Sequence, residues 1–199
     1  MNRVAFIAAS LLAVPVGRAG PVEPEKYVAV SMMFGAAEPV YNGYNVMAVV
    51  DGGYRITELL WARAGVGYGT SIDRFGQHVP NGGRNELVRG GVEARWCAGT
   101  ILCGIAGADL GLQHGTFTDR VYSATVIDGV VESTTDNAFV VIPRIGFDVG
   151  GDRIRARIAI EAETALVEHG TTTTNMVTTT QSQTGVIGVE LAAGVAFQW

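Results

Sequence analysis

Long apolar runs are scarce in this sequence of 199 residues, although 48% of its residues are hydrophobic. Apart from the extreme N-terminus, no run approaches the roughly 18 consecutive apolar residues that a membrane-spanning helix needs. Charged residues are few, at 17%, and the net charge of −5 argues against a nucleic-acid partner. With only two cysteines and three histidines, the sequence shows no zinc-ligand cluster, so neither a metal nor a cofactor is expected.

The apolar run at the N-terminus has the organisation of a signal peptide. Arg3 supplies a short positive region, residues 4–16 form the apolar stretch, and small residues follow at cleavage spacing. The run is too short for an anchor helix, and Pro15 interrupts it. The sequence therefore predicts a signal peptide over residues 1–19 and a mature chain, one domain in size, over residues 20–199. Export makes a disulfide chemically accessible.

Period-two alternation of apolar and polar residues is abundant. In the closing segment, Val189, Leu191, Val195 and Phe197 fall on one face while Glu190 and Gln198 fall on the other, which is typical of a β-strand with two different environments. The same alternation predicts eight strands, over residues 26–37, 44–56, 60–70, 86–97, 102–113, 138–149, 153–167 and 184–199. Each is close to the length that a tilted strand needs to cross a bilayer.

The predicted connections are of two kinds. After the first loop, short turns alternate with long polar segments over residues 71–84, 114–137 and 168–183, as in barrels with short periplasmic turns and longer surface loops. These segments are polar or acidic, and each is a candidate for binding a surface ligand. Pro143 interrupts the sixth strand, so a bulge or local break is expected there, with the proline facing lipid.

The face opposite the apolar one collects the charged residues of the strands. They are Asp51, Arg55, Arg63, Arg89, Glu93, Arg95, Asp109, Arg144, Asp148, Arg155, Arg157, Glu161, Glu163 and Glu190. A soluble barrel would hold its charges outside, but charges on a lipid face cost about 2–4 kcal/mol each at the bilayer centre. The charges are therefore expected to point inward. Because eight strands enclose little more than side chains, they would form a filled, charge-paired interior. A proton or ion path is the alternative use of the same residues.

The alternating pattern, the strand count and the terminal Phe197-Gln-Trp199 resemble the small eight-stranded bacterial outer-membrane barrels, of the OmpA transmembrane domain, OmpX and Ail type. This resemblance implies an all-β, antiparallel, up-and-down transmembrane barrel in the outer membrane and among its lipids. It implies that the barrel-assembly machinery recognises the closing strand through Phe197 and Trp199. It also implies a non-catalytic structural or adhesin-like role at the cell surface.

Cys97 and Cys103 flank the turn between the fourth and fifth predicted strands. With the hairpin centred on Thr100, they lie directly opposite each other, point inward and fall within disulfide range. We therefore predict a disulfide between them. A metal or redox pair is disfavoured, because no histidine or third thiol is close in sequence.

Two other functions stay open from the sequence. Some barrels of this size modify lipid A through a serine, a histidine and a carboxylate near the surface side. The histidines here, His78, His114 and His169, lie in or beside predicted loops without a recognisable serine motif, so no catalytic residue is assigned. A narrow ion-conducting pore is the other alternative.

Overall fold

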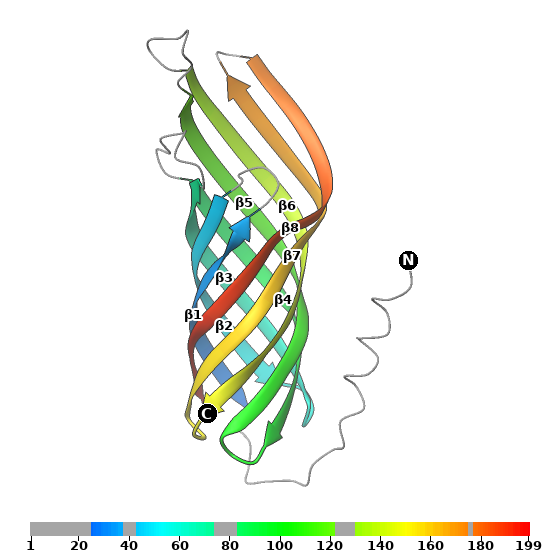
Figure 1. Ribbon diagram of the computed structural model, residues 1–199. Coiled ribbons are helices and arrows are strands. Elements are labelled where there is room, and N and C mark those ends of the chain that lie inside the picture. Colours follow the sequence, from blue (N-terminus) through cyan, green and yellow to red (C-terminus); the bar gives the residue numbers. More distant parts are fainter. Residues whose placement is uncertain (1–24, 38–42, 74–82, 122–129, 175–176) are drawn as a thin grey trace.

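The computed structural model describes residues 25–37, 43–73, 83–121, 130–174 and 177–199. They form eight strands that close into a barrel, as Figure 1 shows. The strands are β1 (Lys26–Ala37), β2 (Gly43–Arg55), β3 (Leu60–Asp73), β4 (Arg84–Ala98), β5 (Leu102–Val121), β6 (Val130–Gly150), β7 (Ile154–Thr174) and β8 (Val177–Gln198). The predicted all-β, eight-stranded fold is confirmed. The predicted signal peptide of residues 1–19 lies outside the described residues.

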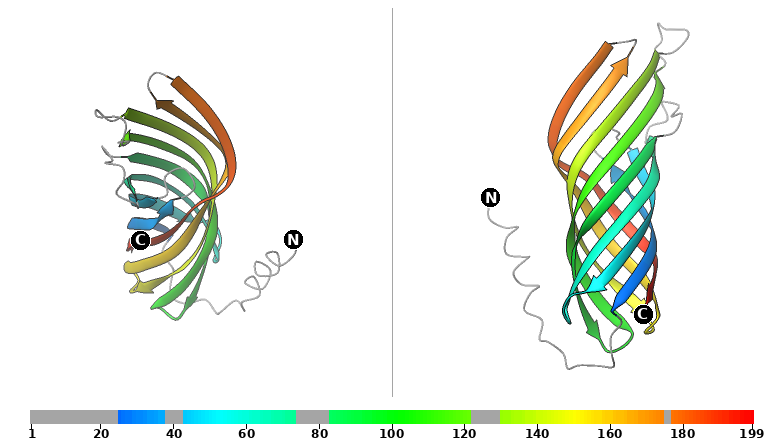
Figure 2. Two further views of the ribbon diagram at one scale, coloured as in Figure 1. Left: turned by 45° about the horizontal axis from the view of Figure 1, so that its top comes forward. Right: turned by 180° about the vertical axis from the view of Figure 1, so that it is seen from behind.

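Every strand pairs antiparallel with its neighbours in sequence, and β1 pairs with β8 to close the wall. This closing ladder runs from the pair Tyr27–Gln198 to the pair Ala37–Gly188. At the short-turn end, the carbonyl of Trp199 accepts hydrogen bonds from the amides of Glu25 and Lys26, at 3.1 and 3.0 Å. The views in Figure 2 show the resulting tilted, continuous wall. None of the described residues forms a helix long and apolar enough to cross a membrane.

The outward face of the barrel wall is apolar on every strand. Val30 is 50% exposed, Val66 56% and Val88 60%, and the same face of the other strands carries further exposed valine, leucine, isoleucine and aromatic side chains. Their neighbours in sequence point inward and are buried. The predicted alternation is confirmed, and an exterior of this kind requires hydrocarbon around it because water would leave a very large apolar surface exposed.

Two predicted long loops are mostly strand, so that part of the prediction is wrong. In the segment 114–137, β5 continues to Val121 and β6 starts again at Val130. In the segment 168–183, β7 continues to Thr174 and β8 starts at Val177. These strands project beyond β1–β4 as a four-stranded sheet at the top of Figure 1. The predicted loop 71–84 is also shorter than expected, because β3 ends at Asp73 and β4 begins at Arg84.

The Thr-rich composition of the projecting sheet explains the error. Thr171, Thr172 and Thr173 of β7 stand directly opposite Thr180, Thr179 and Thr178 of β8. The hydroxyls of Thr173 and Thr178 are 3.1 Å apart, at hydrogen-bond distance. Threonine is β-branched and forms favourable cross-strand pairs. A sheet that extends past the bilayer has no lipid-facing side, so it lacks the apolar alternation that marks the strands of the wall.

Pro143 faces outward, as predicted. It pairs with Ala108 of β5, but the ladder between β6 and β7 has no pair at Ile142 or Pro143. The expected local break is therefore present. A further register shift beside Val140 makes Leu166 an extra residue of β7. Such bulges twist and bend the strand, here near the level at which the sheet leaves the barrel.

Placing a charge on the outward face should test the lipid-facing assignment. Val92 lies in the middle of the outward run of β4 and is 47% exposed. Val92→Arg should lower the free energy of unfolding by about 2–4 kcal/mol in lipid vesicles, measured by urea denaturation. Thr180→Arg, on the projecting part of β8, is the control and should change it by less than about 0.5 kcal/mol. Equal losses would contradict the assignment.

Candidate functional site

The interior face of the barrel carries the charged side chains. Each charge assigned to the interior from the sequence is buried except Arg55, which is half-buried at the end of β2. The buried arginines are Arg63, Arg89, Arg95, Arg144, Arg155 and Arg157. The buried carboxylates are Asp51, Glu93, Asp109, Asp148, Glu161, Glu163 and Glu190. Since an unpaired buried ion costs several kcal/mol, the contacts among these groups decide whether the arrangement is stable.

Glu93 on β4 is the centre of the charged group nearest the short turns. Its carboxylate lies 3.3 Å from a guanidinium nitrogen of Arg95 and 3.5 Å from one of Arg157, and it also pairs with Arg144. Arg157 holds Asp148 with two hydrogen bonds, of 2.8 and 2.9 Å. Arg95 contacts the same carboxylate at 3.1 Å. Bidentate arginine–carboxylate pairs of this kind are among the stronger polar contacts in proteins.

A second charged group lies further from the short turns, around Asp51 and Asp109. Arg63 contacts Asp51 at 2.6 Å and Asp109 at 3.0 Å. Arg89 contacts the same two carboxylates at 3.0 and 3.7 Å. Each arginine therefore bridges two carboxylates from different strands.

Glu161 and Arg144 connect the two groups. Glu161 pairs with Arg89 of one group and lies 3.6 Å from Arg144, which in turn pairs with Glu93 of the other. The result is one continuous ion-pair network of Arg63, Arg89, Arg95, Arg144 and Arg157 with Asp51, Glu93, Asp109, Asp148 and Glu161. Five positive and five negative charges make the network neutral.

Two aromatic side chains contact arginines of the network on its short-turn side, and they were not predicted from the sequence. The guanidinium carbon of Arg95 lies 5.0 Å from the ring centroid of Tyr27 and 4.7 Å from that of Trp61. Arg157 lies 4.6 Å from the Tyr27 ring. These are cation–π distances, which favour arginine in a desolvated place. The signal was available for Trp61, which shares the inward face of β3 with Arg63, whereas the inward face of β1 that carries Tyr27 has no charge.

Glycines on the interior face provide space for the carboxylates. A Cβ on Gly65 would overlap Oδ1 of Asp51, and one on Gly91 would overlap Oδ1 of Asp109. Any larger residue at these positions would displace a member of the network. The high glycine content of the chain therefore has a direct use here.

An apolar cluster fills another part of the interior and was not predicted. Its larger members, Met33, Met47, Leu87, Ile105 and Ile142, are each at most 1% exposed. All of them share the inward face with the charges. The inward face thus carries both ion pairs and ordinary apolar packing.

Glu163 and Glu190 lie outside the ion-pair network. Glu190 stands directly opposite Glu161 on the neighbouring strand and accepts a 2.7 Å hydrogen bond from the amide of Asn45. The amide of Asn85 donates in turn to Asn45 at 2.9 Å. One carboxylate oxygen of Glu163 and one of Glu190 have no hydrogen-bond partner among the described residues. The sequence assigned both glutamates to a fully paired set, but neither joins an arginine in the network that forms.

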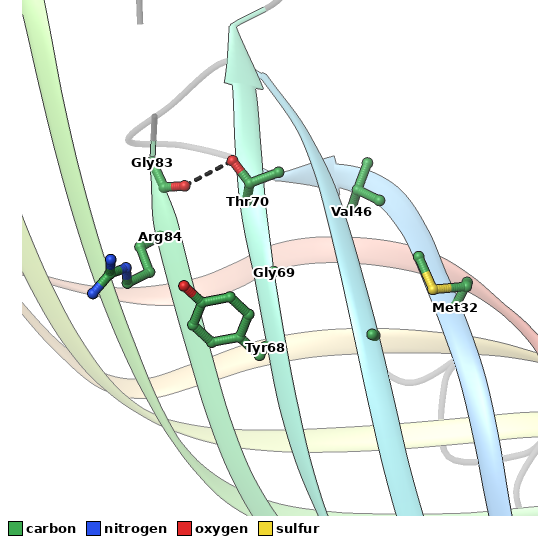
Figure 3. Close-up of a pocket in the computed structure, with 8 residues that line it drawn as sticks. Met32, Val46, Tyr68, Gly69, Thr70, Gly83 and Arg84 are labelled. Atoms are coloured by element: carbon green, nitrogen blue, oxygen red, sulfur yellow. Dashed lines mark hydrogen bonds between the residues drawn. The ribbon is translucent and has the colours of Figure 1, made fainter. Parts of the chain in front are cut away.

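A shallow groove of about 460 Å³ lies on the outside of the wall, across β1–β4 and towards the loop end. Figure 3 shows Met32 and Val46 at one side of it and Tyr68 and Arg84 at the other. The hydroxyl of Thr70 donates a 2.7 Å hydrogen bond to the carbonyl of Gly83 at its rim. The groove faces away from the lumen, so it is separate from the ion-pair network.

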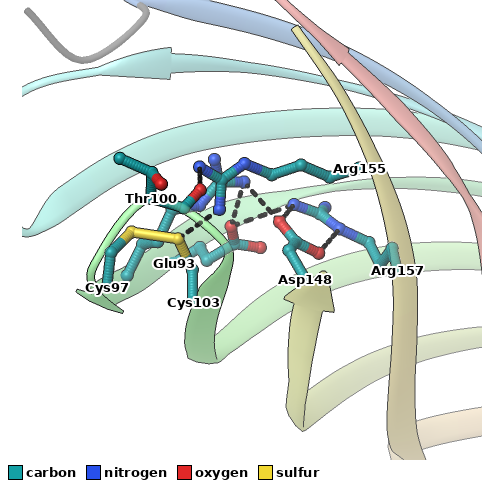
Figure 4. The surroundings of a disulfide bond; sticks show 8 residues. Glu93, Cys97, Thr100, Cys103, Asp148, Arg155 and Arg157 are labelled. Carbon is teal, nitrogen blue, oxygen red and sulfur yellow. Dashed lines mark hydrogen bonds and ion pairs between the residues drawn. A yellow bond between two sulfur atoms is a disulfide. The ribbon is translucent and has the colours of Figure 1, made fainter. Parts of the chain in front are cut away.

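Cys97 and Cys103 form a disulfide across the β4–β5 ladder, where they are direct partners. As direct partners joined by a disulfide, both cysteines lie on the inward face that the sequence predicts; Cys103 is fully buried, whereas Cys97 is exposed next to the end of β4. Figure 4 shows Arg155 and Arg157 reaching from β7 towards this turn. Arg155 donates one hydrogen bond to the sulfur of Cys103 and another, of 3.1 Å, to the carbonyl of Thr100.

The histidines belong to strands or to undescribed residues. His114 is in β5 and His169 in β7, not in the loops predicted for them, and His78 lies outside the described residues. Nδ1 of His114 lies 2.8 Å from the side-chain oxygen of Asn137. Within the described part of the chain, no group of three histidine, cysteine or acidic side chains is arranged to hold a metal ion. Phe197 and Trp199, the predicted assembly signal, are both exposed on the outer wall.

Comparison with known proteins places the fold. No family model and no curated protein matches this sequence. Neisserial surface protein A is similar in structure, with a TM-score of 0.57 and 12% identity over 88% of this chain and 97% of that one. The N-terminal β-barrel domain of Pseudomonas aeruginosa OprF gives 0.53 and 12%, over 89% and 98%. A major outer membrane protein from Thermus thermophilus gives 0.51 and 12%, over 87% and 99%.

The fold is thus that of the small outer-membrane barrels. The continuous apolar exterior and the charged interior require a bilayer around the wall, and together with this fold they place the protein in the outer membrane.

Removing one member of the network should be costly. Glu93→Gln would leave Arg95, Arg144 and Arg157 with less negative charge in a buried place, and should lower the free energy of unfolding by about 3 kcal/mol or more. Glu86→Gln is the matched control, because Glu86 is an exposed glutamate on the same strand. Its effect should stay within about 0.5 kcal/mol. Urea titration of both variants in vesicles measures the difference, and equal effects would show that the network adds nothing.

Proposed function

We propose that this eight-stranded outer-membrane barrel is a non-catalytic protein that binds a surface partner through its projecting sheet. In this proposal residues 1–19 are a signal peptide, and residues 20–199 are exported and inserted by the barrel-assembly machinery through the last strand with Phe197 and Trp199. The ion-pair network serves to hold the wall closed. The binding element is the part of β5–β8 that lies beyond β1–β4.

The outer edge of β8 beyond its ladder with β1 is the observation that carries this proposal. The ladder between β1 and β8 ends at the pair Ala37–Gly188, and no described strand pairs with the remaining outer edge of β8, over residues 177–187. An edge strand of this kind is the element with which an extended segment of a partner can pair through backbone hydrogen bonds. Thr178, Thr179 and Thr180 on it are exposed. We therefore propose an extended polypeptide segment as the partner's chemistry.

The interior favours a plugged barrel over a pore. Arginines and carboxylates contact each other across the lumen, and the apolar cluster around Met47 and Leu87 occupies a further stretch of it. Moving an ion through would require separation of buried ion pairs and desolvation of the ion at the apolar level. Glu161, Arg89 and Arg144 already satisfy one another, which also argues against a catalytic use of the network.

Shortening the β7–β8 hairpin should abolish binding while leaving the barrel intact. Gly170 and Gln181 are direct partners, so residues 171–180 can be replaced by Asn-Gly, which forms a tight hairpin turn. Cells displaying the shortened variant should lose adhesion to at least one member of a panel of immobilised extracellular proteins that cells with the full barrel bind. A heat-dependent gel shift in both proteins would show that each barrel has folded.

A triple variant separates backbone pairing from side-chain contacts. Changing Thr178, Thr179 and Thr180 to valine preserves shape and the backbone edge but removes the hydroxyls. Adhesion should be retained within about twofold if the edge pairs through its backbone. If no member of the panel distinguishes the full from the shortened hairpin, the proposed role is wrong.

The plugged interior has its own test. Purified protein in planar bilayers should give no resolved single-channel steps at moderate voltage, because the ion-pair network fills the lumen. A general porin inserted in the same apparatus serves as the positive control. Stable, ion-selective steps from this protein would contradict the plug and favour the narrow pore.

A further inference from the structure

The two sulfur atoms of the disulfide are in different surroundings. Cys97 is exposed at the end of β4, beside the turn that contains Gly99 and Thr100. Cys103 is fully buried at the start of β5, on the interior face. Cys97 is therefore the more accessible residue of the pair to a thiol from outside the barrel, because Cys103 is fully buried.

The two sulfurs also differ in charge environment, because Arg155 contacts the sulfur of Cys103. Arg155 is 6% exposed, and its Nη1 donates a hydrogen bond to Sγ of Cys103. Nη2 donates a 3.1 Å hydrogen bond to the carbonyl of Thr100, which belongs to the turn and not to the disulfide. This second bond is made to the turn, so breaking the bond between the two sulfurs does not by itself remove it (Figure 4). A fixed cation next to a sulfur stabilises it as a thiolate.

Two carboxylates near Cys103, those of Asp148 and Glu93, are each paired with other arginines. Asp148 is the direct partner of Cys103 on β6, and a free carboxylate there would oppose a thiolate. Its two oxygens are held by Arg157 and Arg95, at 2.8 and 3.1 Å. Glu93 is likewise paired with Arg95 and Arg157, and with Arg144. Among the described residues, Arg155 is a cation in direct contact with the sulfur of Cys103.

We infer that this disulfide is a site of thiol–disulfide exchange, in which an external thiol attacks Cys97 and Cys103 is the leaving group. The attacking thiolate forms a bond to Sγ of Cys97, and the bond between the two cysteines breaks. Its electron pair goes to Cys103, whose thiolate is held by Arg155. A second thiol then attacks the mixed disulfide and releases Cys97 as a thiolate. Two thiols are oxidised to one disulfide, and one disulfide is reduced to two thiols.

The reaction is directional for two reasons that act together. Attack at a disulfide is governed by access to the sulfur and is faster when the leaving thiolate is better stabilised. Here the accessible sulfur and the stabilised leaving group are the two ends of the same bond. The co-reactant is a low-molecular-weight thiol or the dithiol of a thiol oxidoreductase at the short-turn end of the barrel.

Mapping the mixed disulfide tests the direction of attack. The folded protein in detergent is treated with reduced glutathione, quenched with an alkylating agent and digested, and fragment ions locate glutathione on Cys97 or Cys103. Adducts on Cys97 should exceed those on Cys103 at least tenfold. Equal labelling, or labelling mainly at Cys103, would overturn the inference.

Two arginine variants test the role of Arg155. Arg155→Gln should slow reduction of the disulfide by glutathione at least threefold, and Arg155→Lys should restore most of the rate. Arg153→Gln is the control for overall charge, because Arg153 is exposed on the adjacent turn; its rate should stay within twofold of the parent. Unchanged or faster reduction in Arg155→Gln, with the heat-dependent gel shift retained, would contradict the inference. If Arg155→Gln does not fold, the Arg155→Lys rate and the adduct map decide it.

Discussion

Pairing of opposite charges inside a closed wall is the constraint on which this structure depends. An eight-stranded barrel holds little more than side chains, so each inward arginine must find a carboxylate across the lumen. The partners come from strands far apart in sequence, as with Arg89 and Glu161 or Arg144 and Glu93. The network therefore joins β2–β7 through side chains as well as through backbone ladders. A slip of one residue in any of these strands would turn its charges towards lipid, so the network also specifies register.

The sequence predicted those features that depend on one strand at a time. Parity along β4 is enough to place Val88 and Val92 outside and Arg89 and Glu93 inside, and short turns are recognisable from glycine and polar residues. Which carboxylate pairs with which arginine could not be predicted from the sequence, because whether Arg89 meets Glu161 or Glu190 depends on the tilt and stagger of the whole barrel. The same dependence left Glu163 and Glu190 outside the network. The placement of Met47 and Leu87 in one apolar cluster likewise depends on the barrel as a whole and cannot be predicted from either strand alone.

The projecting sheet was missed for a different physical reason. Alternation reveals a strand only where its two faces meet different surroundings, and the arms of β5–β8 leave the bilayer. There, threonine pairs such as Thr173 and Thr178 take over from lipid contact as the source of strand preference. The two ends of the molecule consequently differ. One end is tied by the disulfide, by Arg155 and by the backbone bonds of Trp199, and at the other end β8 extends past its ladder with β1.

The ladder between β1 and β8 has a consequence for how the protein reaches its native state. It joins the first strand to the last, so the wall cannot shut until the final segment has been delivered. Until that moment β1 presents a bare edge and the apolar faces lack their hydrocarbon surroundings. Long-range pairing of this kind is slow compared with hairpin formation. The nascent chain is thus most vulnerable to aggregation during its transit to the bilayer, and an escort that shields both β1 and the exposed valines would meet that need.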